Sequence, residues 1–147
     1  MKTKTILVPV DGSQHALRAL REAADMAKAF DGTILLLNVQ YDLETFHTRR
    51  FFSREQIEQY EKELSDEVLT PAVDELRQYE VAFEVKVRVG SPKKEIIAEA
   101  SECSADYIVM GSRGMGSVMG SVLGSVSYGV LNEASCPVVI VPNRKEK

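Results

Sequence analysis

The sequence has no tryptophan and only two cysteines, Cys103 and Cys136, among its 147 residues. The two cysteines do not form a C-x-x-C pair, so neither a zinc site nor a disulfide framework is indicated. No apolar run approaches the roughly 18 residues that a membrane-spanning helix requires, and the first residues do not resemble a secretory signal. We therefore expect a cytoplasmic protein with reduced thiols and no membrane association.

Basic residues are also fewer than acidic residues. The chain has 18 Lys and Arg residues against 22 Asp and Glu residues, which gives a formal net charge of −4. Because such a chain does not attract nucleic acid as a whole, we expect no nucleic-acid partner. Residues 41–53 do mix Phe46, Phe51 and Phe52 with basic side chains, a composition found in single-strand binders. A single cluster of this kind in an acidic chain favours a mobile surface flap or a packing surface, and its role stays open.

Short apolar runs alternate with helical patterns along the chain, and the length suits a single domain over residues 1–147. Four runs are typical of strands buried in a parallel sheet, at residues 5–10, 33–39, 105–110 and 136–142. Residues 81–89 alternate apolar and charged side chains, which predicts an edge strand with one exposed face. Apolar residues at helical spacing fill the gaps, and Pro71 predicts a kink or a break in one helix. The pattern indicates an α/β sandwich with a mostly parallel five-stranded sheet.

A glycine- and serine-rich stretch follows the fourth predicted strand. Five of the nine glycines lie between Gly111 and Gly124, and glycine lets a backbone approach a ligand closely. Such a loop before a helix suits an anion bound by backbone N–H groups. The stretch is not a P-loop, because Ser117 and Val118 stand where Lys and Ser/Thr are needed. It is not a dinucleotide fingerprint either, because Met119 replaces the third glycine. A flexible linker would not need the apolar residues within it.

Three segments follow strand ends and can therefore share one crevice. They are the Asp11 turn, residues 38–40 and the glycine-rich stretch. In open α/β sheets, ligands bind beyond the carboxyl ends of the strands, where the strand order reverses.

These residues resemble the universal stress protein family, and the resemblance covers the whole chain. It rests on residues 6–13 (ILVPVDGS), 105–114 (ADYIVMGSRG) and 136–142 (CPVVIVP). The ATP-binding members carry the pattern G-x2-G-x9-G-S/T. Without a gap, this chain supplies Gly111, Gly114, Gly124 and Ser125 in that pattern.

The resemblance implies a Rossmann-like three-layer sandwich with sheet order 3-2-1-4-5 and helices on both faces. It implies ATP between the ends of the first and fourth strands, with Mg²⁺ or Mn²⁺ bound only through the phosphates. Adenine would lie near Val10, Val39 and Val89, and the ribose near Asp11 and Gly111. The full set of implied nucleotide-binding residues is Pro9, Val10, Asp11, Val39, Val89, Met110, Gly111, Arg113, Gly114, Gly124, Ser125, Val126 and Ser127.

We expect an ATP-binding or adenine-nucleotide-binding protein that regulates a stress response, with a partner that the sequence does not name. The alternative is an ATP hydrolase at the same site. Its turnover would be slow, because no residue pair near the loop stands out as catalytic. Asp11 is interpreted as a ribose contact rather than a simple turn former, and Arg113 as either a site residue or a solvated charge. The family pairs its last strand across a two-fold axis, which predicts a homodimer. That strand contains Val138, Val139, Ile140 and Val141.

Overall fold

The computed structural model of the chain describes residues 3–113 and 123–142. Its elements, in order, are β1 (Thr5–Pro9), α1 (Gln14–Phe30), β2 (Thr33–Gln40), α2 (Phe46–Arg49), α3 (Arg54–Arg77), β3 (Ala82–Val89), α4 (Pro92–Glu102), β4 (Tyr107–Gly111), α5 (Ser125–Glu133) and β5 (Val138–Val141). The strands form one parallel sheet in the order β3-β2-β1-β4-β5. The predicted α/β class and the strand order are both confirmed.

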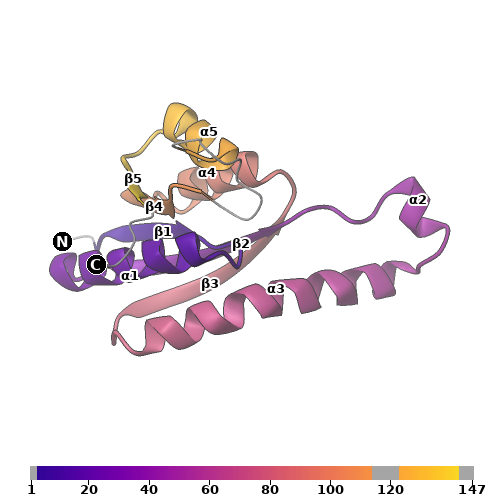
Figure 1. Ribbon diagram of the computed structural model, residues 1–147, viewed down its shortest axis with the longest axis horizontal. Coiled ribbons are helices and arrows are strands. Elements are labelled where there is room, and N and C mark those ends of the chain that lie inside the picture. The colour runs from indigo at the N-terminus through magenta and orange to yellow at the C-terminus, as the bar shows by residue number, and fades with distance from the viewer. Residues whose placement is uncertain (1–2, 114–122, 143–147) are drawn as a thin grey trace.

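The sheet is the middle of three layers (Figure 1). Helices α1 and α3 cover one face, and α4 and α5 cover the other. Alternate residues of β1 pack against the two helix layers, because successive side chains along a strand point to opposite faces. Ile6 and Val8 pack in the core under α1 and α3, whereas Leu7 packs in the core under α4 and α5. All three are fully buried, so the nearly all-apolar sequence of β1 fits a central strand.

Helix α1 begins immediately behind the end of β1. The Ser13 hydroxyl accepts a hydrogen bond from the Ala16 N–H at 3.1 Å, which caps the helix. The Asp11 carboxylate accepts one from the Ser13 N–H at 3.0 Å, which fixes the turn between strand and helix. These two bonds hold the start of α1 at the carboxyl edge of the sheet.

The sequence predicts a kink or a break at Pro71. Helix α3 runs unbroken from Arg54 to Arg77 with Pro71 inside it, so the break into two helices is wrong. A proline removes one backbone hydrogen bond from a helix. Here Leu69, Ala72 and Leu76 are buried on both sides of Pro71 and hold that part of the helix against the core. Tertiary packing therefore keeps the helix continuous.

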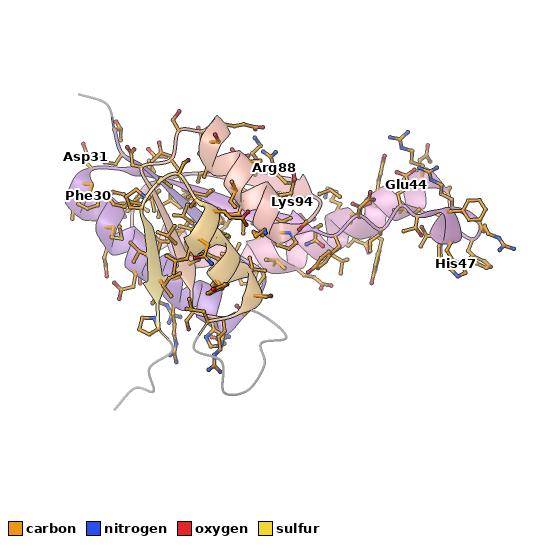
Figure 2. All side chains as sticks on the ribbon, turned by 90° about the horizontal axis from the view of Figure 1, so that it is seen from above. Phe30, Asp31, Glu44, His47, Arg88 and Lys94 are labelled. Atoms are coloured by element: carbon orange, nitrogen blue, oxygen red, sulfur yellow. The ribbon has the colours of Figure 1, made fainter. Side chains whose placement is uncertain are left out.

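The first half of α3 and the short helix α2 project from the body of the molecule as an arm (Figure 1). His47 lies near the far end of this arm (Figure 2). Two capping boxes build it, one between Thr45 and Thr48 and one at the start of α3. Phe46 and Phe51 are 84% and 66% exposed. The segment is thus a surface connection whose aromatic rings do not pack into this chain's core.

Strand β3 is an edge strand, as predicted. The face that stays open carries Val85, Val87 and Val89, each 45% or 46% exposed. The opposite face is covered by α4, whose Glu99 is 2% exposed and lies 2.8 Å from the Arg88 guanidinium. Ion pairing to α4 therefore covers the charged side of the strand.

Candidate functional site

A cavity of about 800 Å³ opens at the carboxyl edge of the sheet. It is lined by the ends of β1, β2 and β4, by the middle of α3 and by the first residues of α4 and α5. The strand order reverses between β1 and β4, which is where open parallel sheets bind ligands. Its volume is within the range of roughly 300–1,000 Å³ that is usual for small-molecule sites.

The cavity brings together most of the residues that the sequence predicts for a nucleotide site. Those that line it are Pro9, Val10, Asp11, Val39, Met110, Gly111, Arg113, Gly124, Ser125, Val126 and Ser127. Val89 does not line it, because this residue ends the edge strand β3, beyond β2, and its side chain is on the open face. Gly114 lies outside the described residues.

One wall of the cavity was not predicted. Leu64, Glu67 and Val68 of α3 line it, facing the strand ends. The helical spacing of Leu64 and Val68 marks them as buried, but spacing alone does not reveal that α3 continues past the sheet edge and closes the cavity. The polar side chains of Asn38 and Gln40, at the end of β2, also contribute to the lining.

Gly111 is placed where no side chain fits. A Cβ atom at this position would lie 2.8 Å from both the Cβ and the carbonyl oxygen of His15 in α1. The Gly111 carbonyl in turn accepts a hydrogen bond from the buried Ser127 hydroxyl at 2.8 Å. The glycine thus allows β4, α1 and α5 to meet at the floor of the cavity.

The two ends of the glycine-rich stretch are joined by a backbone hydrogen bond, because the Gly124 N–H donates to the Ser112 carbonyl at 2.7 Å. Ser112 is further tied to β5 through its own N–H, which donates to Val141 at 3.1 Å. Gly124 and Ser127 both belong to the implied nucleotide-binding set, and the Gly124 N–H and the Ser127 hydroxyl are therefore already engaged within the chain.

The start of α5 offers a second set of donors. The N–H groups of Ser125, Val126 and Ser127 occupy the first turn of the helix and have no acceptor within it. Gly124 stands at the N-cap position, where it has no side chain to cover them. All three residues line the cavity. This end of α5, with the positive end of its dipole, can therefore bind an anion in the cavity.

Residues 2–142 match the family model described as the Universal stress protein family. The chain belongs to this family. Universal stress protein MJ0531 of Methanocaldococcus jannaschii is 32% identical over 145 residues, which are 98% of this chain and 85% of that protein.

Solved structures of other universal stress proteins have the same fold. One from Lactobacillus plantarum aligns with a TM-score of 0.72 and 26% identity, over 96% of this chain and 99% of that one. One from Archaeoglobus fulgidus, solved in complex with dAMP, aligns with a TM-score of 0.67 and 25% identity, over 95% and 97% of the two chains.

The described part of this universal stress protein builds no metal centre from its own side chains. No group of three or more His, Cys, Asp or Glu residues within 3–113 and 123–142 is placed to hold an ion. Nor is any helix in those ranges long and apolar enough to cross a membrane. Burial raises the pKa of both the Cys103 and the Cys136 thiols, which keeps them protonated and poorly nucleophilic.

Proposed function

We propose that this universal stress protein binds an adenine nucleotide, ATP or a close relative, in the cavity and acts as a nucleotide-dependent regulator of a stress response. One observation carries the proposal: an apolar crevice, a carboxylate at Asp11 and the uncapped start of α5 meet at the point where the strand order reverses. The dAMP complex of the Archaeoglobus fulgidus relative supports an adenine nucleotide as the ligand.

In this proposal, Val10 and Val39 contact the base, and Asp11 accepts hydrogen bonds from the ribose hydroxyls. The phosphates accept hydrogen bonds from the first N–H groups of α5. Charge-assisted hydrogen bonds each contribute on the order of 1.5–3 kcal/mol. A few of them can hold a triphosphate despite the net charge of −4. A Mg²⁺ or Mn²⁺ ion would bind through the phosphates.

Calorimetric titration of the wild-type protein with ATP and Mg²⁺ tests the site, with Gly124→Val as the main variant. A valine at the N-cap places a branched side chain over the N–H groups of α5, so we expect affinity to fall by about tenfold or more, since each tenfold is worth about 1.4 kcal/mol. Thermal unfolding of the variant should remain cooperative.

Ser101→Val is the matched control. It introduces the same side chain at an exposed position of α4 that does not line the cavity, so ATP affinity should not change. If Gly124→Val binds ATP as tightly as the wild-type protein does, the phosphates are not held at the start of α5.

We also propose that the protein is a homodimer paired through β5. This strand is the second edge of the sheet, and its four residues are all apolar. Apolar edge strands are normally covered or paired, because their free N–H and C=O groups otherwise recruit other chains.

A further inference from the structure

We propose that the Gln40 side chain selects adenine by accepting a hydrogen bond from its exocyclic 6-amino group, and that Asn38 positions it for this role. The inference rests on the proposed nucleotide site and names the group that distinguishes one purine from another there. It comes from three connected hydrogen bonds in the wall of the cavity. One end of this chain is an acceptor only, which fixes which atom donates and which accepts in the rest.

The fixed end is the Val10 carbonyl oxygen, at the end of β1, which can only accept. Asn38 is 1% exposed, and its amide nitrogen Nδ2 donates to that oxygen at 2.9 Å. The amide oxygen Oδ1 of Asn38 is therefore turned the other way. There it accepts from the Ser65 hydroxyl of α3 at 2.9 Å and from Gln40 Nε2 at 2.7 Å.

This arrangement sets the orientation of the Gln40 amide. Its nitrogen must face Asn38, because the opposite orientation would bring two carbonyl oxygens together and lose a hydrogen bond. Its oxygen, Oε1, is then left as an acceptor. Among the described residues, Oε1 has no donor, and no buried side-chain polar atom lacks a partner, so Oε1 is accessible.

Both amides belong to the cavity. Asn38 and Gln40 are two positions apart on β2, so their side chains leave the same face of the strand, and both line the cavity beside Val10. Leu64 and Val68 of α3 supply apolar surface on the facing wall. An aromatic base that enters between these walls meets the oriented Gln40 oxygen on the β2 side, and Glu67 lies with Leu64 and Val68 on the α3 side.

The chemistry of the base decides the preference. Adenine carries an amino group at carbon 6, which donates to an oxygen acceptor. Hypoxanthine and guanine carry a carbonyl oxygen at the same position, which would face Gln40 Oε1 as a second acceptor. A site built to hydrogen-bond one group discriminates strongly against a ligand that leaves its polar atom unpaired. The cavity should therefore prefer ATP to ITP, which differs from ATP in this part of the base.

The experiment measures dissociation constants for ATP and ITP, each with Mg²⁺, by calorimetry. We expect the wild-type protein to bind ATP about tenfold or more tightly than ITP. Gln40→Leu keeps a side chain of similar size without the acceptor, so the ratio of the two constants should approach one, mainly through weaker ATP binding. Gln59→Leu is the matched control on the exposed arm, and it should keep the wild-type ratio.

Asn38→Ala tests the positioning role. Without Asn38 the Gln40 amide can present either end to the base, so selectivity should fall even where the protein stays folded. A merely structural role would weaken ATP and ITP binding equally and leave their ratio unchanged.

The outcomes separate the two proposals. Equal affinity of the wild-type protein for ATP and ITP, or an unchanged ratio in Gln40→Leu, overturns the role of Gln40 and leaves nucleotide binding intact. If the wild-type protein binds neither nucleotide, the proposed function itself is wrong, and this inference falls with it.

Discussion

Gly111 lies where the end of β4 passes directly against the first turn of α1. Its missing side chain is a packing requirement, because a Cβ atom would stand 2.8 Å from the His15 carbonyl oxygen. We expect Gly111→Ala to lower the free energy of unfolding by roughly 1–3 kcal/mol, the usual cost of overpacking a core. The variant should also bind nucleotide more weakly, since relief of the clash moves α1 or β4 at the cavity floor. Urea denaturation and ATP titration measure the two effects.

Gly129→Ala is the control for that substitution. There the added Cβ would meet only the side-chain carbons of Lys93, which can move aside. Because alanine is favoured over glycine inside a helix by up to about 1 kcal/mol, this variant should be neutral or more stable. If the two variants have the same stability, close packing at Gly111 is not what the site requires.

At the scale of elements, local sequence patterns predict most helices and strands, because each pattern has a single physical cause. The nearly all-apolar run of β1 and the edge strand β3 both lie where the sequence indicates. Pro71 misleads because its local cost is outweighed by buried neighbours that belong to the tertiary structure. The wall of the cavity that α3 forms also depends on tertiary structure, so the sequence does not predict it. The family resemblance likewise implies Gly124 and Ser127 as nucleotide-binding residues, but it does not reveal that groups of both are hydrogen-bonded within the chain.

The contact between β3 and α4 is an ion cluster centred on Arg88. Its guanidinium lies 3.1, 2.8 and 3.0 Å from carboxylate oxygens of Glu95, Glu99 and Glu102. The hydrogen bond from Arg88 holds the pKa of Glu102 below its ordinary value of 4.5. A carboxylate with a lowered pKa in the folded state stabilises the fold above its unfolded pKa, and this stability is lost as the pH falls through the folded value.

Arg88→Met should therefore reduce both the stability and its acid dependence. We expect a loss of roughly 1–3 kcal/mol near pH 7, because Glu99 stays buried and Lys86, at 2.7 Å, is then its one cation partner among residues 3–113 and 123–142. As the pH falls below the ordinary carboxyl pKa of about 4.5 and through the lower folded pKa of Glu102, the difference in stability between the variant and the wild-type protein should shrink. Urea denaturation across this pH range measures the difference.

Arg54→Met removes an exposed i,i+4 pair with Glu58 on α3 and should change stability by less than about 1 kcal/mol at any pH. A constant gap between Arg88→Met and the wild-type protein from neutral to acid pH would mean that the cluster acts through packing rather than charge.

At the scale of the whole molecule, the proposed dimer depends on which backbone groups of β5 are already used. The carbonyl oxygens of Pro137 and Val141 accept hydrogen bonds from β4 and the residue that follows it, at 3.0 and 3.1 Å. Successive residues of a strand direct their backbone N–H and C=O groups to opposite sides. The groups of residue 139 therefore face β4, like those of 137 and 141, whereas the groups of residues 138 and 140 face the free edge. Pairing with a second copy must use this outer set.

Ile140→Pro removes an outward N–H and leaves the bonds to β4 in place, so it should convert the dimer into a folded monomer. Val139→Pro removes an N–H that faces β4, so it should instead lower the stability of the fold. Sedimentation velocity reports the oligomeric state of each variant, and circular dichroism reports whether it is folded. A substitution that changes only the side chain, such as Val139→Lys, would not separate loss of the dimer from loss of stability as well, because Val139 also packs against the core. If Ile140→Pro sediments as a dimer, the two copies meet through a surface other than β5.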